Sequence, residues 1–127
     1  MSQKSIAQKL LLKSGNTFLL LNSPQDYLDQ IGALPEDVNI ITQAKSSVDV
    51  IQCFLTTKKG LEECMAELPD RLDSKGIFWI SYPKGTSKMA SEVNRDTINS
   101  YAMSVGWRGI AIFSVDETWS ALRLRPM

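Results

Sequence analysis

The chain has 127 residues, of which 43% are hydrophobic and 22% are charged, and its formal net charge is zero. This composition excludes a disordered or fibrous chain, and the length fits one globular domain, residues 1–127. The chain has no histidine, so Ser-His and Cys-His nucleophile pairs are excluded. The two cysteines lack the spacing of a zinc site, and we therefore expect no bound metal.

Hydrophobic segments and cysteines indicate the cellular setting. The longest apolar runs, such as residues 18–21, are too short to cross a bilayer, and residues 1–5 do not resemble a signal peptide. Cys53 and Cys64 fall in an expected strand and an expected helix, where reduced core thiols are the usual state. We therefore expect a cytoplasmic protein that does not contact a membrane.

Charge is distributed unevenly along the chain. Residues 1–74 contain seven Lys or Arg and ten Asp or Glu, whereas residues 75–127 contain seven and four. The positive excess in the second part favours an anionic ligand there, although ordinary surface variation has the same pattern. Because no dense stripe of Lys and Arg is present, we do not expect binding to duplex nucleic acid.

Helical and extended segments alternate along the chain until the last twenty residues. Apolar residues at helical spacing predict helices, and short apolar runs rich in β-branched residues predict strands. In chain order we expect a helix over 3–13, a strand over 17–22, a helix from Ser23 to Gly32, strands over 38–42 and 48–55, a helix from Lys58 to about Leu68, a strand over 76–82, a helix from Asn94 to Gly106, and strands over 107–115 and 118–124. Asp116 and Glu117 join the last two strands in a tight antiparallel hairpin.

The second expected helix has a clear start signal. Ser23 is suited to the N-cap and Pro24 to the first helical position, because proline has no amide hydrogen to leave unpaired there. The helix then presents Tyr27, Leu28 and Ile31 on one side.

Spacing also assigns positions to side chains of later elements. Asp49 opens a strand, and we expect it to bond backbone amides of the preceding turn. Val105 is expected on the inner face of the last helix. Trp119 and Arg123 lie four residues apart in a strand and so share a face, where the tryptophan forms either a core anchor or a stacking platform for a base or sugar.

This order of elements predicts an α/β fold. Strand–helix alternation followed by a hairpin indicates a mostly parallel sheet with helices on both faces, a three-layer arrangement. The near-continuous apolar strands agree, because each strand is then buried on two sides. A flavodoxin-like arrangement fits the early pattern equally well, but such sheets do not usually end in an antiparallel hairpin.

The strongest candidate site follows the fourth expected strand. An apolar run ends at Tyr82 and is followed by a loop with Pro, Gly, two hydroxyls and two lysines. Such donors, with an arginine at the start of the next helix, are the components of a phosphate or carboxylate site. The expected anion-binding residues are Lys84, Gly85, Thr86, Ser87, Lys88, Asn94 and Arg95. The spacing is not that of a P-loop, and the alternative is a solvated loop with surface lysines.

Several segments carry a resemblance to known families. Residues 49–55 and 72–80 are similar to the central strand, turn and following strand of class I methyltransferase-like domains, although Ser74-Lys75-Gly76 replaces the usual Pro-Gly-Gly. Residues 19–27, 80–88, 94–96 and 116–123 resemble a family of short bacterial proteins of unknown function, and this resemblance covers nearly the whole chain. The resemblance to class I methyltransferase-like domains, together with the right-handed crossover rule, implies a Rossmann-like, methyltransferase-like fold with strand order 38–42, 17–22, 48–55, 76–82, 118–124, 107–115.

The resemblance to methyltransferases stops at their cofactor site. Their first strand runs into a glycine-rich turn, whereas residues 21–25 contain no glycine. Their second strand normally ends in an acidic residue, whereas this one ends in Ile41-Thr42-Gln43, and one strand–helix unit is missing. We therefore expect no S-adenosylmethionine binding and no other cofactor.

Three functions fit these observations. The leading one is a non-catalytic binding or regulatory module that binds an anionic small molecule at the edge where the parallel strands end. The second is an enzyme acting on a phosphorylated or carboxylated small molecule, with Lys84 or Lys88 as electrostatic stabiliser and Tyr82 or Asp96 as acid or base. The third is a structural subunit of a homodimer or larger homo-oligomer that pairs through its hairpin edge. No residue is assigned a catalytic role from the sequence.

Overall fold

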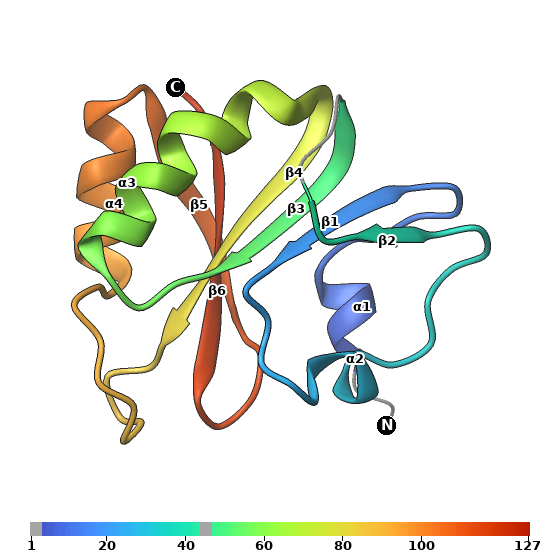
Figure 1. Ribbon diagram of the computed structural model, residues 1–127, viewed down its shortest axis with the longest axis horizontal. Coiled ribbons are helices and arrows are strands. Elements are labelled where there is room, and N and C mark those ends of the chain that lie inside the picture. Colours follow the sequence, from blue (N-terminus) through green and yellow to red (C-terminus); the bar gives the residue numbers. More distant parts are fainter. Residues whose placement is uncertain (1–3, 44–46) are drawn as a thin grey trace.

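The predicted strands form a single mixed sheet. The computed structural model describes residues 4–43 and 47–127. The strands are β1 (Thr17–Leu21), β2 (Asn39–Ile41), β3 (Val48–Phe54), β4 (Leu72–Pro83), β5 (Trp107–Ser114) and β6 (Trp119–Pro126). They lie in the order β2-β1-β3-β4-β6-β5 (Figure 1). β1 to β4 are parallel, whereas β6 is antiparallel to both β4 and β5. The predicted strand order and terminal hairpin are confirmed.

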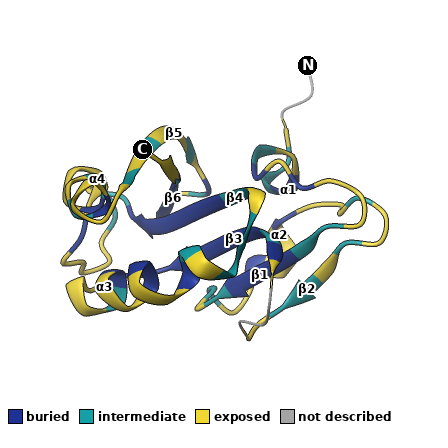
Figure 2. Ribbon diagram, turned by 90° about the horizontal axis from the view of Figure 1, so that it is seen from above, coloured by how far each residue is buried: buried dark blue, intermediate teal, exposed yellow. Residues whose placement is uncertain are grey.

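Helices cover both faces of this sheet. They are α1 (Ile6–Lys9), α2 (Tyr27–Gln30), α3 (Lys58–Glu67) and α4 (Arg95–Ser104), with a 3-10 turn, η1 (Leu68–Arg71), after α3. α3 and α4 pack on one face, and α1 and α2 pack on the other (Figure 1, Figure 2). The arrangement is the predicted three-layer α/β architecture. Within the described ranges, no helix has the length and apolar character needed to cross a membrane.

The central strands are buried on both sides (Figure 2). Alternate residues of a strand point to opposite faces. In β3, Ile51 and Cys53 therefore pack with α3 and α4, whereas Val50 and Phe54 pack with α1 and α2. This two-sided burial explains why the strand is an almost continuous apolar run.

α4 begins where the sequence predicts. The side chain of Asn94 accepts a hydrogen bond from the Thr97 amide at 3.0 Å, which caps the helix. Gly106 follows the helix with a φ of 91°, a conformation that favours glycine. The predicted inward position of Val105 is wrong, because the regular helix ends at Ser104 and the Val105 side chain is exposed.

The first helix is shorter than predicted. α1 ends at Lys9, and Leu11 has a φ of 67°, which is incompatible with a continuing right-handed helix. The Leu10 carbonyl accepts a hydrogen bond from the indole nitrogen of Trp79 at 3.1 Å. The predicted helix over 3–13 is therefore too long, because a left-handed turn and a tertiary hydrogen bond end the helix early. Residue 3 lies outside the described residues.

The start of the second helix also differs from the prediction. α2 begins at Tyr27 with Asp26 at the N-cap, and Ser23 does not cap it. Leu28, predicted to face the core, is 50% exposed, whereas Tyr27 is buried. The physical reason lies in the buried sheet: the Tyr27 hydroxyl donates a hydrogen bond to Gln52 Oε1 at 2.7 Å, which fixes the orientation of this short helix.

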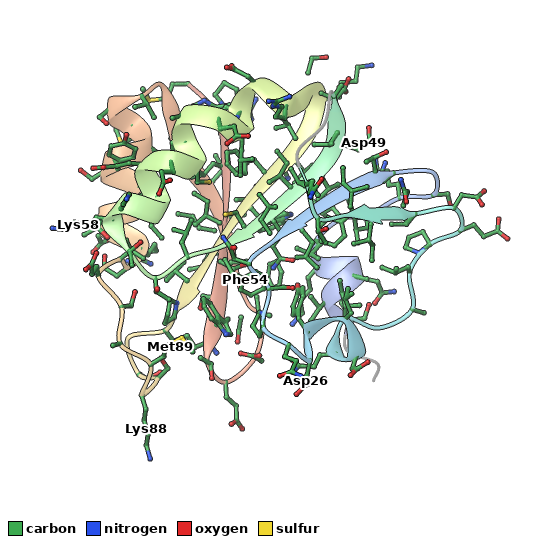
Figure 3. All side chains as sticks on the ribbon, in the orientation of Figure 1. Asp26, Asp49, Phe54, Lys58, Lys88 and Met89 are labelled. Atoms are coloured by element: carbon green, nitrogen blue, oxygen red, sulfur yellow. The ribbon has the colours of Figure 1, made fainter. Side chains whose placement is uncertain are left out.

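Asp49 joins β3 to the neighbouring strand (Figure 3). Its Oδ2 accepts a hydrogen bond from the amide of Thr17 at 2.7 Å. The predicted bonds to the preceding turn concern residues 44–46, which lie outside the described residues. Thr17 is the first residue of β1, which lies beside β3. The carboxylate therefore links the starts of two neighbouring strands.

The hairpin is closed by an aspartate. Asp116 Oδ1 accepts hydrogen bonds from the amides of Thr118 and Trp119, each at 2.8 Å. The Trp119 side chain is buried and lies edge-on to Phe54, with ring centroids 5.0 Å apart. Of the two roles considered for this tryptophan, the structure supports the core anchor.

Candidate functional site

The carboxyl ends of β1, β3 and β4 meet at one edge of the sheet, called the carboxyl edge below. The loop from Lys84 to Val93 and the β5–β6 turn reach the same edge (Figure 1). The sequence therefore places its candidate loop where open α/β sheets bind ligands.

This loop is attached to the body of the protein at both ends. The Lys84 amide donates to the Thr118 carbonyl at 2.7 Å, which joins the loop to the hairpin. The Glu92 amide donates to the Thr56 carbonyl at 2.8 Å, and the Glu92 carboxylate accepts from the Lys58 amide at 2.9 Å. The start and the end of the loop are thus fixed relative to β6 and to α3.

Three hydroxyl groups form a row across the sheet beside the loop. Tyr82 of β4 is paired in register with Ser120 of β6, and Ser120 is paired with Ser114 of β5. Paired residues of neighbouring strands point to the same face, so the three hydroxyls lie on one side of the sheet. This hydroxyl row lies on the face that α3 and α4 cover.

Two cationic side chains lie next to the hydroxyl row. The Lys84 ammonium donates a hydrogen bond to the Ser114 hydroxyl. This bond holds the lysine side chain over the hydroxyl row. Arg95 is the first residue of α4, where the positive end of the helix dipole adds to its charge. Both side chains line a cavity of about 380 Å³, called the Lys84 cavity below. Its walls are formed by Tyr82, Lys84, Gly85, Thr86, Asn94, Arg95, Asp96, Ile112 and Ser120.

Five of the seven predicted anion-binding residues line this cavity: Lys84, Gly85, Thr86, Asn94 and Arg95. Ser87 and Lys88 do not. The Ser87 hydroxyl donates to the Lys84 carbonyl at 2.8 Å and so closes the loop on itself. The Lys88 side chain extends from the loop away from the rest of the molecule (Figure 3).

The backbone conformation at Gly85 does not require a glycine. Its φ lies outside the left-handed region, and a Cβ atom added there would meet nothing within 4 Å. The backbone at this position is therefore open to other residues, and its glycine is not what shapes the cavity.

The charges in the cavity are partly balanced. The Arg95 guanidinium lies 3.5 Å from the Asp96 carboxylate, and both side chains are largely exposed. Burial raises the pKa of Tyr82 above its ordinary value, while the Arg95 charge and a hydrogen bond with Ser120 act in the opposite direction. At neutral pH the Tyr82 hydroxyl is therefore protonated and can donate a hydrogen bond.

Sequence reasoning missed part of this cavity. Ser120 and Ile112 come from the hairpin, and only the pairing register places Ser120 beside Tyr82 and Ile112 in the next row, in line with Ile80. The sequence did contain a signal for Ser120. It lies two residues before Leu122 in the strand, so both side chains point to the face opposite to that of Trp119. Among the residues that the structure describes, no group of three or more Asp, Glu or Cys side chains is arranged to hold a metal ion.

A second part of the carboxyl edge is filled by aromatic side chains. The Tyr27 and Phe54 ring centroids are 4.9 Å apart, and the Phe54 and Trp119 centroids are 5.0 Å apart, both pairs edge-on. These three buried residues are called the aromatic cluster below, and its middle member, Phe54, is the last residue of β3 (Figure 3). Beside them remains a cavity of about 270 Å³ that includes Asn22 and Thr57.

No family model and no curated protein matches the sequence. Solved structures do match the fold. A SAM-dependent methyltransferase from Aquifex aeolicus aligns with a TM-score of 0.63 and 14% identity, over 94% of this chain and 89% of that chain. A TehB-like SAM-dependent methyltransferase from Corynebacterium glutamicum aligns with a TM-score of 0.60 and 12% identity, over 95% and 85%.

A ribosomal protein L11 methylase from Lactobacillus delbrueckii subsp. bulgaricus aligns with a TM-score of 0.61 and 11% identity, over 94% of this chain and 74% of that chain. At such low identity the likeness concerns the fold alone. The order and direction of the six strands agree with it. This chain has the Rossmann-like methyltransferase fold.

Proposed function

We propose that this chain is a non-catalytic binding module that holds an anionic small molecule in the Lys84 cavity. The observation that carries the proposal is that Lys84 and Arg95, from two separate elements, line one cavity beside a row of hydroxyls. An anion there would receive charge-assisted hydrogen bonds from both cations. The cavity also lies at the carboxyl edge, the usual ligand position in open α/β sheets.

S-adenosylmethionine, on which the similar methyltransferases depend, does not fit the residues present here. The turn after β1 has Asn22 in the left-handed region with a φ of 58°, so a side chain projects where a glycine would leave the backbone open. The aromatic cluster occupies the adjoining space. We therefore propose no methyl transfer.

The groups in the Lys84 cavity support binding better than they support a reaction. A general base must lose its proton near the working pH, but burial raises the pKa of Tyr82 and keeps its hydroxyl protonated. The other candidate, Asp96, is exposed and paired with Arg95. We assign neither a catalytic role.

Thermal unfolding in the presence of inorganic phosphate tests the proposal. A ligand at one hundred times its dissociation constant stabilises the folded state by about 2.7 kcal/mol. We expect phosphate to raise the melting temperature of the wild-type protein. Lys84→Ala and Arg95→Ala should each reduce that increase, and the double variant should abolish it. Because both side chains are solvent-accessible, the ligand-free variants should stay within about 0.5 kcal/mol of the wild type.

Lys88→Ala is the matched control, because it removes one positive charge from the same loop outside the cavity. It should respond to phosphate like the wild type. The proposal is wrong if phosphate gives no stabilisation, or if Lys88→Ala weakens the response as much as Lys84→Ala does.

A further inference from the structure

The Lys84 cavity has an apolar part that an inorganic anion would not use. On the face of the sheet that carries the hydroxyl row, the next row inward consists of Ile80, Leu122 and Ile112, paired in register. Ile80 and Leu122 are buried. Ile112, the last member of the row, is 48% exposed and lines the cavity. The cavity thus runs from a polar, cationic end to an apolar end.

The volume of the cavity also favours a ligand with an organic part. Its volume of about 380 Å³ lies in the range of pockets for small organic ligands, roughly 300–1,000 Å³. A water molecule takes up about 30 Å³ in the liquid, so an anion of five heavy atoms fills only a small part of it. The remaining space adjoins Ile112 and the ring of Tyr82.

The charge in the cavity favours a phosphoryl group over a carboxylate. Lys84 and Arg95 are both cationic, and the positive end of the α4 dipole adds to them, while the Asp96 carboxylate offsets part of this charge. A phosphate monoester carries a charge of about −1.5 to −2 at pH 7, whereas a carboxylate carries a single negative charge. The phosphoryl group is therefore attracted more strongly to this net positive site, where Thr86 and Ser120 also offer hydroxyl donors.

We propose that the Lys84 cavity takes a phosphate monoester with a small, apolar organic part. The phosphoryl group lies between Lys84 and Arg95, and the organic part packs against Ile112 and the Tyr82 ring. This inference rests on the proposed function, because it names the class of anion that the same cavity binds.

Calorimetric titration of the wild-type protein with four compounds tests it. The probes are inorganic phosphate, phenyl phosphate, glycerol 3-phosphate and phenol. We expect phenyl phosphate to bind about tenfold more tightly than inorganic phosphate, because part of its ring leaves water. Glycerol 3-phosphate has the same head and a polar body, so it should bind no more tightly than inorganic phosphate. Phenol alone should not bind measurably.

Ile112→Ser locates the apolar contact. It should remove most of the advantage of phenyl phosphate and leave the affinity for inorganic phosphate unchanged. Ile110→Ser is the matched control, since Ile110 lies on the same strand, is 40% exposed and does not line the cavity. It should leave both affinities unchanged.

The failures of the two proposals are distinguishable. If inorganic phosphate and phenyl phosphate both fail to bind, the proposed function is wrong. If inorganic phosphate binds and phenyl phosphate binds no better, only the present inference is wrong. It is also wrong if glycerol 3-phosphate binds as tightly as phenyl phosphate, if phenol binds as tightly, or if Ile110→Ser and Ile112→Ser have the same effect.

Discussion

Gln52 shows how one polar residue can organise the core of this protein. It is wholly buried in the central strand β3. Its Oε1 accepts from the Tyr27 hydroxyl at 2.7 Å, and its Nε2 donates to the Ser81 hydroxyl at 2.9 Å. Because buried polar groups are costly when unpaired, this network specifies where α2 must pack against the sheet.

We predict that Tyr27→Phe lowers the free energy of unfolding by about 1–3 kcal/mol, because Gln52 then loses a donor in a dry environment. Urea unfolding at neutral pH measures the change. The matched control is Tyr101→Phe, which removes a hydroxyl from a half-buried tyrosine outside the network. Equal stability of Tyr27→Phe and the wild type would show that the buried network does not stabilise the fold.

The same substitution has a predicted pH dependence. Burial raises the pKa of Tyr27 far above its ordinary value of about 10, and the hydrogen bond to Gln52 only partly opposes this. The folded-state pKa is thus higher than the unfolded one. The stabilisation from protonated Tyr27 is fully present below about pH 10 and is lost as the pH rises towards the folded pKa. The difference in stability between wild type and Tyr27→Phe should therefore stay constant up to about pH 10 and shrink as the pH rises above it.

At the level of elements, the N-terminus of α4 has two roles that substitution can separate. Asn94 caps the helix through its hydrogen bond with Thr97, and it also lines the Lys84 cavity. Aspartate caps a helix as well as asparagine does, but it adds a negative charge. We predict that Asn94→Asp keeps the stability of the wild type and weakens phosphate binding by about fivefold or more, through charge repulsion.

Asn94→Ala is the complementary variant. It should lower the free energy of unfolding by about 1 kcal/mol, because the cap is lost, and should affect phosphate binding less than Asn94→Asp does. Urea unfolding and phosphate calorimetry on both variants give the comparison. If the two variants weaken phosphate binding equally, the charge at this position does not face the bound anion.

Elements with strong local signals were predictable from the sequence, and those fixed by tertiary contacts were not. α3 and α4 combine helical spacing with capping residues, and both form close to their predicted bounds. α2 has a start signal at Ser23 and Pro24, yet it begins at Tyr27, whose hydrogen bond to Gln52 determines its position. The local pattern could not contain that bond, because Gln52 lies 25 residues away.

The candidate site likewise has parts that were predictable from the sequence and parts that were not. Lys84 and Arg95 follow a predicted strand and open a predicted helix, so their meeting at the carboxyl edge could be expected. The direction of Lys88 could not, because side chains of an irregular loop follow no period. Ser114 and Ser120 required the register of the hairpin, which depends on the turn at Asp116.

The β5 edge of the sheet bears on the third function considered, a homo-oligomer that pairs through its hairpin edge. β5 is the outer strand of the hairpin. The Gly109 amide of β5 donates to the Asn99 side chain of α4 at 2.8 Å, and the register with β6 shifts between Gly109 and Ala111. An occupied amide and an irregular register oppose continuous pairing of this strand with a second copy.

For the whole molecule, the fold and the cofactor chemistry of methyltransferases are two separate properties. The fold is that of methyltransferases, whereas our proposal is that Asn22 in the turn after β1 and the aromatic cluster leave no room for S-adenosylmethionine. We predict that calorimetry detects no binding of this compound at micromolar concentrations. A SAM-dependent methyltransferase titrated in parallel is the positive control. A dissociation constant in the low micromolar range, about −8 kcal/mol, would contradict the prediction.

We propose that an anion binds in the Lys84 cavity and not at the end of β1. Titration of the ¹⁵N-labelled protein with inorganic phosphate, followed by amide chemical shifts, distinguishes these two positions. We expect saturable shifts at the amides of Lys84, Thr86 and Arg95, with little change at Asn22 and Thr57, which line the cavity beside the aromatic cluster. Shifts confined to Asn22 and Thr57, or no saturable shift at any amide, would contradict it.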